Sequence, residues 1–335
     1  MVSKTLSHLE TYNKELRYDV FFENFNGGLI RDDEKSFYAN LMYAIYKCCP
    51  KFDKNPKSVE FFEEEYEKNI ANNDEAKKEI YGTYETMAMI NSWLNYKQIY
   101  RFDEDTMNLL MESECKDMTF EELKKVKLPY ECFSIENEIE YDDKIIDTIF
   151  FNRMFDDDSN EMLLMIYGVC KGNGFQLLKL NIVLESDTKE VQNTLFKELD
   201  ERCLPKAVDF FKKIMNLVLY LCQPKVEILK KRVEKKEDTT DKKKIKHFYR
   251  VSYDSNDVGV ELGNAIRNYR YVYEKGESTP GKKGSVKKPH LRCGHFQRYW
   301  LGSRKIEKRE FVVKYIPPIF VKGGASKIAT LHNVK

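Results

Sequence analysis

The chain has 335 residues, of which 42% are hydrophobic, 13% aromatic and 33% charged, and its formal net charge is +1. This content excludes a wholly disordered chain, and the length suffices for roughly two domains of ~150 residues each. The longest compact apolar run, Ile214 to Cys222, contains Asn216 and is far shorter than the ~20 apolar residues of a transmembrane helix. We therefore expect a soluble globular protein.

The N-terminus and the cysteines indicate a compartment. Met1 to Leu6 contains one lysine, and polar and acidic residues follow where a secretory signal peptide has its apolar core. The eight cysteines lack the dense spacing of a disulfide scaffold, and their only close pair is Cys48 and Cys49. We expect reduced, mostly buried thiols and a cytoplasmic protein.

Residues 1–127 are predicted to be mainly helical. The clearest helical pattern runs from Asn73 to Lys97, where apolar residues recur at three- and four-residue spacing and Trp93 widens the stripe. Another helix is predicted to begin near Asp103, and Thr119 to Glu122 has the form of a capping box.

Strands are predicted after Lys127, where the period of the apolar residues changes. Leu128 to Ile135 alternates around Pro129. The apolar runs Met162–Val169 and Phe175–Val183 flank a segment with two glycines, which predicts an antiparallel hairpin.

Helix is predicted again over Thr188–Cys203 and Pro205–Cys222. The second of these has Pro at its first turn and is apolar on most sides, as expected of a central helix. The charge-dense stretch Lys225–Lys246 is predicted to be a solvated helix extension that leads into a loop.

The C-terminal part is predicted to change from helix to strand. Asp257 to Tyr273 suits a helix, and Lys275 to Lys288 is a flexible basic connector with three glycines and a proline. His290–Trp300 and Glu310–Val321 are predicted to be neighbouring strands, and Pro317-Pro318 confines the last strand to an edge or splits it.

These elements predict an α+β fold. The expected organisation is a helical N-terminal region (1–127), an α+β core whose mixed, largely antiparallel sheet packs on the helix from Pro205 (128–224), a charged linker (225–256) and a basic C-terminal region (257–335).

The small net charge hides a strong asymmetry along the chain. Residues 1–200 carry 24 Lys and Arg against 41 Asp and Glu, a net −17, whereas residues 201–335 carry 32 against 14, a net +18. Between Lys282 and Lys314 there are eleven Lys or Arg and only two acids. This segment is therefore the candidate surface for a polyanion or an acidic partner.

Cations and aromatics alternate within the segment from Lys287 to Gly302. Cations neutralise phosphates, and Phe296, Tyr299 and Trp300 could stack on unpaired bases, which predicts binding of RNA or single-stranded nucleic acid. The alternative is that the rings pack inward and the cations form a solvated strand face that complements the acidic half.

Other chemistry finds less support in the sequence. His290, Cys293 and His295 are possible zinc ligands, but no second Cys/His pair lies at finger-like spacing. The segment Gly276–Lys283 nearly matches a phosphate-binding loop but has Lys283 at the hydroxyl position. The acidic runs at Asp142 and Asp156 are expected to be solvated loops. No metal or other cofactor is predicted.

The C-terminal motif resembles that of a known family. Lys288–Phe296, Tyr299–Gly302 and Phe311–Val321 resemble the closing motif of the second type V-A anti-CRISPR family, phage and mobile-element proteins that suppress the type V-A CRISPR effector nuclease. Weaker similarity extends upstream, in the family's order, through Ile99–Glu104, Leu128–Cys132, Leu219–Cys222 and Val258–Gly263, so that the likeness covers about residues 80–322. The chain departs from the family at Cys293, commonly basic, and at Phe296, commonly Trp.

The resemblance implies inhibition of effector biogenesis in the host bacterial cytoplasm. Such a protein recognises the effector's nascent N-terminal peptide and causes loss of its mRNA, so the implied partners are that peptide and mRNA or the ribosome. Arg292 and Arg298 are the hypothetical phosphate contacts, and Tyr299 or Trp300 the hypothetical base stackers. The implied binding residues are Pro289, His290, Arg292, Gly294, His295, Phe296, Arg298, Tyr299, Trp300 and Gly302.

Two other functions stay open from the residues. The first is an RNA-cleaving enzyme in which His290 or His295 acts as acid or base and Arg292 stabilises charge on the phosphate. The second is a phage regulatory protein whose basic end binds DNA without sequence preference.

Overall fold

The computed structural model of the chain describes residues 3–16, 74, 89–90, 92–115, 126–156, 161–171, 177–185, 204–234, 252–274, 290–292, 294–302, 310–317 and 319–321. The chain forms two interleaved units. Unit 1 comprises Met1–Arg101, Tyr130–Lys189 and Lys230–Asn256, and unit 2 comprises Phe102–Pro129, Glu190–Leu229 and Asp257–Lys335. The four consecutive regions expected from the sequence stay a prediction.

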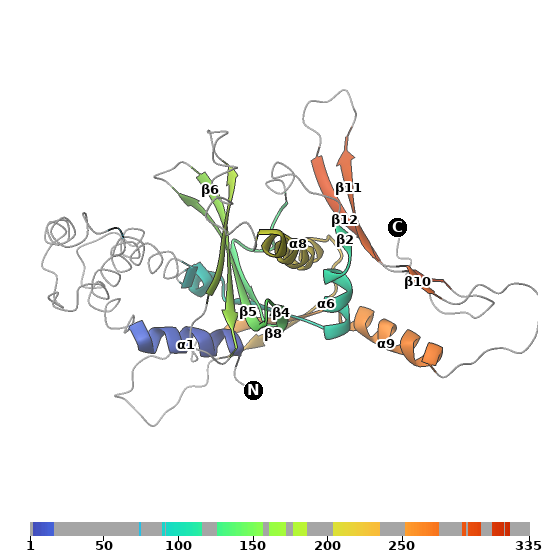
Figure 1. Cartoon of the computed structure of the whole chain (residues 1–335), viewed down its shortest axis with the longest axis horizontal. Helices are drawn as coiled ribbons and strands as arrows, with labels where there is room; N and C mark the ends of the chain where they lie inside the picture. Colours follow the sequence, from blue (N-terminus) through green and yellow to red (C-terminus); the bar gives the residue numbers. More distant parts are fainter. Residues whose placement is uncertain are drawn as a thin grey trace, which may run out of the picture. The chain divides into compact units, whose positions relative to one another are not determined.

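Unit 1 contains most of a mixed sheet of eight strands, seven of them in the order β7-β6-β5-β3-β1-β9-β8, with β4 paired to β5 (Figure 1). The β1–β3 pair is parallel, whereas β5 is antiparallel to β3, β4 and β6, and β6 to β7. This confirms the mixed, largely antiparallel sheet. The strands are β1 (Gln98–Phe102), β3 (Cys132–Ile135), β4 (Ile139–Tyr141), β5 (Lys144–Asp156), β6 (Glu161–Cys170), β7 (Leu177–Glu185), β8 (Ile228–Val233) and β9 (Tyr253–Val258).

Two hairpins fix the register of this sheet. The predicted hairpin is confirmed as β6 and β7, in which Met165 lies opposite Asn181. The β4–β5 hairpin turns at Asp142 and Asp143, whose φ angles are 44° and 63°. Two successive positive φ angles give the turn whose twist matches the flanking strands, and Asp tolerates them better than most residues. This acidic pair is therefore a turn, as expected.

The central strands are buried on both faces. All four residues of β3 are buried, and in β1 only Arg101 is half-buried. Such strands form short apolar runs without alternation, so the sequence pattern alone does not separate them from helix. This explains why β1 was not predicted although the helix before it was predicted to end at Lys97. Lys97 has a positive φ of 53° and donates its N–H to the Trp93 carbonyl, as at a helix C-terminus.

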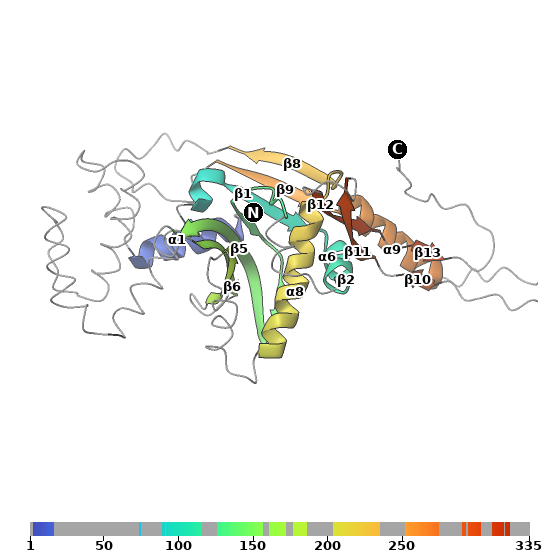
Figure 2. The ribbon, with the colours of Figure 1, turned by 90° about the horizontal axis from the view of Figure 1, so that it is seen from above.

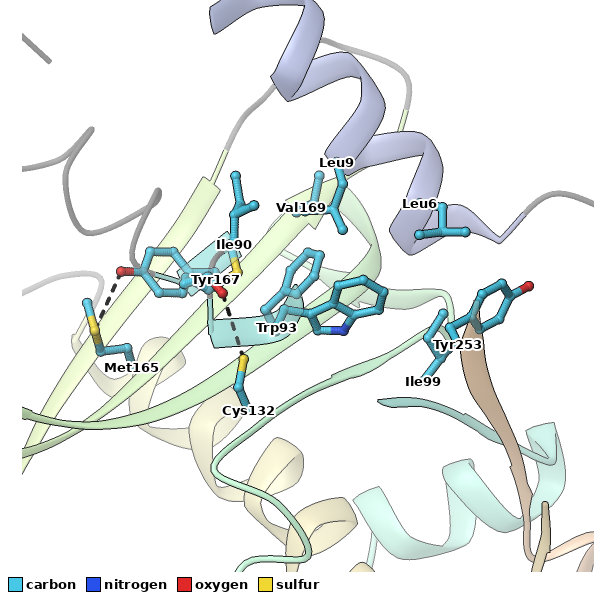
Figure 3. Packing of buried hydrophobic residues seen from close by; sticks show 12 residues of the cluster. Leu6, Leu9, Ile90, Trp93, Ile99, Cys132, Met165, Tyr167, Val169 and Tyr253 are labelled. Atoms are coloured by element: carbon cyan, nitrogen blue, oxygen red, sulfur yellow. Dashed lines mark hydrogen bonds between the residues drawn. The ribbon is translucent and has the colours of Figure 1, made fainter. Parts of the chain in front are cut away.

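The hydrophobic core of unit 1 lies between the sheet and two helical segments (Figure 3). One is α1 (Lys4–Leu16), which contributes Leu6 and Leu9, and the other comprises the helical residues 89–90 and 92–96. Trp93 is fully buried, and its Nε1 donates to the Gln98 carbonyl at 3.3 Å and to Ser134 Oγ at 3.2 Å. In the described part of the predicted helix Asn73–Lys97, Met89, Ile90 and Trp93 thus belong to the core.

Glu136 anchors the start of α1 to the sheet. This buried carboxylate accepts hydrogen bonds from Ser3 Oγ, from the Thr5 N–H at 2.8 Å and from Arg101 Nε at 2.8 Å. It thereby satisfies an orphan amide of the helix and places negative charge at its N-terminus, both of which stabilise a helix. At the neighbouring exposed site, hydrogen bonds from Lys171 and Lys4 lower the pKa of Glu138 to about 2.

One prediction about the linker region is wrong. The stretch from Lys225 was expected to extend the preceding helix, but that helix ends at Leu221 and residues Ile228–Val233 form β8. Figure 2 shows β8 beside β9 at the edge of the sheet. Arg232 of β8 forms an ion pair with Asp254 of β9 at 2.8 Å. Lysines are common on edge strands because they oppose pairing with other chains, and a lysine-rich strand is easily mistaken for a solvated helix.

The described residues of unit 2 form three helices and two small sheets. The helices are α6 (Glu104–Met111), α8 (Leu204–Leu221) and α9 (Val260–Glu274), and α6 contacts both α8 and α9. One sheet has the order β12-β11-β2, and in the other β10 pairs with β13. The strands are β2 (Glu114–Cys115), β10 (His290–Arg292), β11 (His295–Leu301), β12 (Glu310–Ile316) and β13 (Ile319–Val321).

The predicted helices of this unit are confirmed. Every residue of α8 from Ile214 to Leu221 is buried, as expected of a central helix, and Asn216 within it donates to the Leu110 and Ser113 carbonyls. The packing of the large sheet on α8 stays a prediction. Thr119–Glu122, Thr188–Cys203 and Lys275–Lys288 lie outside the described residues.

Asp103 joins α6 to α9. Its carboxylate caps α6 by accepting from the Asp105 and Thr106 N–H groups, and it forms an ion pair with Arg267 of α9 at 2.9 Å. Gly263 of α9 lies so close that a Cβ there would overlap this carboxylate. Hydrogen bonds from Arg267 to Asp103 and Asp105 raise the pKa of the Arg267 guanidinium above its ordinary value. The Asp103 carboxylate therefore occupies the space that a side chain at position 263 would fill, so α6 and α9 can meet here only because Gly263 has no side chain.

In the part of the chain that the structure describes, no helix is both long and apolar enough to span a membrane. The side chains of Cys132, Cys170 and Cys222 are free thiols, and burial raises the pKa of the Cys132 thiol. These three cysteines agree with the expected reduced state.

Candidate functional site

The C-terminal motif divides between two strands of unit 2. His290 and Arg292 lie in β10, opposite Val321 and Ile319 of β13, whereas His295 to Leu301 form β11, which pairs antiparallel with β12. The two predicted C-terminal strands are neighbours and pair antiparallel, but the first, predicted as one strand over His290–Trp300, is divided into β10 and β11. The second is divided at residues 317–318 into β12 and β13, one of the two outcomes predicted for Pro317-Pro318. His290 and His295, the two candidates for an acid or base, lie in strands of different sheets.

Strand β11 has one residue that faces the core and several that face solvent. Phe296 is buried, while His295 and Gln297 on either side of it are exposed. Trp300 and Leu301, at the end of the strand, keep 45% and 44% of their surface exposed. Successive residues of a strand point to opposite faces, so Trp300 lies on the face of Phe296, and Leu301 lies on the face of His295, Gln297 and Tyr299.

A column of aromatic rings attaches β11 to the rest of unit 2. Phe296 packs on Tyr315 of β12 with ring centroids 5.0 Å apart, and Tyr315 meets Tyr220 of α8 edge-on at 5.4 Å. Burial of the Tyr220 hydroxyl, with Tyr315 and Glu227 nearby, raises the pKa of Tyr220 above the usual tyrosine range. A Cβ at Gly294 would overlap the Tyr315 hydroxyl. Gly294 and Phe296 of the motif therefore hold the strand in place.

The opposite face of β11 and β12 carries polar groups and one cation. Tyr299 donates its hydroxyl to Gln297 Oε1 at 2.8 Å, and Lys314 Nζ lies 5.4 Å from the centre of the Tyr299 ring. Lys314 is exposed and lies opposite Gln297. This face can contact an anionic or aromatic partner through Lys314, Tyr299 and His295.

The structure places only some of the predicted binding residues. Pro289 and Cys293 lie outside the described residues, and for His290, Arg292 and Arg298 only the backbone is described. Gly302 follows β11 with a positive φ of 110°, a conformation that favours glycine. Among the described side chains, no three His, Cys, Asp or Glu groups gather where they could hold a metal ion.

Comparison with known proteins identifies the family. The AcrVA2-like family, described as the anti-CRISPR type V subtype A2 family, matches residues 100–323. The chain belongs to this family. An AcrVA2-like protein acts against type V-A CRISPR systems, which the resemblance of the C-terminal motif had implied. No curated protein matches the chain in sequence.

The fold agrees with this membership. The structure is similar to the crystal structure of AcrVA2, with a TM-score of 0.56 and 17% sequence identity over 96% of this chain and 100% of that one. The AcrVA2-like match spans parts of both units. Two of its upstream segments, Ile99–Glu104 and Val258–Gly263, meet where the Asp103 N–H donates to the Val258 carbonyl at 2.9 Å. These segments maintain the scaffold.

Sequence reasoning assigned no role to two structural contributors to this site, although Tyr315 lies within the motif segment Phe311–Val321. The Tyr315 ring packs on Phe296 of the motif, and the side chain of Gln223, just beyond α8, forms hydrogen bonds with the backbone of β12. A tyrosine in a strand and a glutamine after a helix carry no signal of such roles, because both depend on which elements the tertiary structure brings together.

Proposed function

We propose that this AcrVA2-like protein recognises the nascent N-terminal peptide of a type V-A CRISPR effector and lowers the level of its mRNA and protein. The proposed surface comprises exposed and half-buried residues on both faces of β11 and β12: His295, Tyr299, Leu301 and Lys314 on one face, and Trp300 at the end of the other. Arg292 and Arg298, which lie within the segment Lys287–Gly302, are the proposed contacts to mRNA or ribosomal RNA.

The observation that carries this proposal is that β11 is packed at Phe296 but exposed toward its C-terminal end. Phe296 is buried against Tyr315, so the strand is held by its own packing, while Trp300 and Leu301 stay exposed. Had the motif served only to close the molecule, its rings and His295 would be sealed from solvent. The exposed ring of Trp300, and the half-buried ring of Tyr299 with Lys314 over it, suit contacts with both peptide and RNA.

The test is a reporter transcript measured in cells that make the protein. Three leaders precede the reporter: the effector's first codons, the same peptide in synonymous codons, and the original nucleotides read in a shifted frame. We expect loss of mRNA with the first two leaders only, because the peptide is the signal. Equal loss with the frame-shifted leader would contradict peptide recognition.

The surface is tested by two matched variants. Trp300→Ala is expected to restore the reporter mRNA at least partly, because it removes the largest exposed ring of β11. Tyr271→Ala on α9, which removes an aromatic side chain that is 56% exposed, is the control and should leave suppression unchanged. Equal suppression by both variants would remove β11 from the proposal.

A further inference from the structure

The side chain of Gln223 binds the outer edge of β12 through main-chain groups. Its Nε2 donates to the Val313 carbonyl at 3.1 Å, and its Oε1 accepts from the Tyr315 N–H at 2.8 Å. The second hydrogen of Nε2 goes to the Leu219 carbonyl of α8 at 2.7 Å. One carboxamide thus connects the end of the helix to the edge of the sheet.

In the part of unit 2 that the structure describes, no strand pairs with this edge, and the residue just beyond α8, Gln223, lies on it. The main-chain groups of a strand residue point to one side, and neighbouring residues alternate. Since Val313 and Tyr315 bond Gln223, they point away from β11, which pairs through the residues between them. Strand β12 is the last strand on this side of its sheet, among the described strands.

A carboxamide has the donor and the acceptor of a peptide group. Peptides in extended conformation bind proteins by adding to such an edge, where main-chain hydrogen bonds supply affinity and side-chain contacts supply selectivity. Gln223 fills this position with a single amide on a flexible side chain, which an arriving strand can displace by making the same hydrogen bonds.

Charge indicates one feature of the arriving strand. Lys314, between the two bonded residues, is exposed, and no acidic side chain lies directly opposite it on β11, where its partner is Gln297. A residue added beside Lys314 would place its side chain on the same face, so opposite charge there is stabilising. An Asp or Glu at this register fits best.

We infer that the edge of β12 at Val313 and Tyr315 is a strand-addition site for an extended peptide with an acidic residue beside Lys314, and that Gln223 closes this edge until the peptide binds. This inference rests on the proposed function, since the peptide is taken to be the effector leader that the reporter carries. Beyond the proposed function, it specifies the strand edge on which the peptide lies and the side chain, Gln223, that the peptide displaces.

The first experiment measures binding of a synthetic leader peptide to the whole protein by fluorescence anisotropy. Two further peptides carry N-methyl groups on alternate backbone nitrogens, one set on even and one on odd residues. A strand-added peptide bonds the edge through only one of these sets. We expect one methylated peptide to lose at least tenfold in affinity and the other to bind nearly as well as the parent.

Variants locate the edge. Gln223→Ala should bind the peptide about fivefold more tightly, because the peptide no longer competes with the carboxamide. Val313→Pro removes an N–H that points outward and should weaken binding at least tenfold. Lys314→Glu should also weaken binding, whereas Lys231→Glu on β8, also an exposed lysine of a strand, is the control and should not.

The outcomes separate the two proposals. If the wild-type protein binds no leader peptide, the proposed function itself fails. If it binds but both methylated peptides, Val313→Pro and Lys314→Glu behave like the parent, the peptide lies elsewhere and only the edge assignment is overturned. If Gln223→Ala instead forms dimers in sedimentation experiments and gains no peptide affinity, the occupant is a second copy, which also overturns it.

Discussion

The two tryptophans of the chain lie in opposite surroundings. Trp93, in the core of unit 1, is fully buried and its indole N–H is hydrogen-bonded, whereas Trp300, at the end of β11 in unit 2, keeps 45% of its surface exposed. The strands around Trp93 are buried on both faces, while β11 is buried on one. The difference teaches that unit 1 places its tryptophan in the core, whereas unit 2 leaves one partly exposed, where the proposed partner could reach it.

Trp93→Ala should give the largest loss of stability. The substitution removes a fully buried ring and leaves a cavity, so the free energy of unfolding should fall by about 4 kcal/mol. Urea denaturation followed by circular dichroism measures this. A fall of less than about 1 kcal/mol would mean that the core around Trp93 is not closely packed.

Glu136→Gln should come next. The variant keeps the size of the side chain but leaves Arg101 without its carboxylate partner, so we expect a loss of about 2 kcal/mol after allowance for the partial exposure of Arg101. Glu138→Gln, two residues further, is the control, because its exposed pairs with Lys4 and Lys171 should contribute little. Equal effects of both variants would contradict the anchoring of α1 by Glu136.

Gly263→Ala probes the contact between α6 and α9 in unit 2. The added methyl group displaces the Asp103 carboxylate, and we expect a loss of about 2 kcal/mol. In a double-mutant cycle with Asp103→Ala, the two losses should not add, because either change alone breaks the same contact. Additive losses would show that the glycine matters for another reason.

The stability of unit 2 should fall in alkali. The pKa of Tyr220 is higher in the folded protein than the ordinary value of 10.0. The folded state therefore holds this proton more tightly, and its contribution is present below about pH 10 and lost as the pH rises further. Denaturation curves between pH 9 and pH 11 should show this loss, which Tyr220→Phe should reduce. If the Tyr220→Phe variant loses as much stability in alkali as the wild-type protein, groups other than Tyr220 cause the loss.

Trp300→Ala should change stability least, by about 0.5 kcal/mol, because Trp300 keeps 45% of its surface exposed in the folded protein. Iodide should quench the fluorescence of the Trp93→Phe variant, in which Trp300 is the remaining tryptophan, and quench the Trp300→Ala variant only weakly. Similar quenching in both variants would mean that Trp93 and Trp300 are equally accessible to solvent, which would contradict the comparison.

Much of the secondary structure could be predicted from local pattern. The hairpin of β6 and β7, the central helix α8, the N-cap at Asp103 and the split of the last strand at Pro317 each follow from spacing or from single residues with special backbone preferences. Strands β1 and β8 could not be predicted this way. The pairing of β1 with β3 and the place of β8 at the sheet edge depend on residues far along the chain.

The candidate site divides in the same manner. The sequence by itself determined the family, the basic C-terminal segment and the residues of its motif, because composition and motif are properties of the chain. Only the tertiary structure decided that Phe296 faces inward on Tyr315 while Trp300 stays exposed, and that Gln223 meets the edge of β12. The physical reason is that burial and strand pairing arise between segments that are distant in sequence, which no local period encodes.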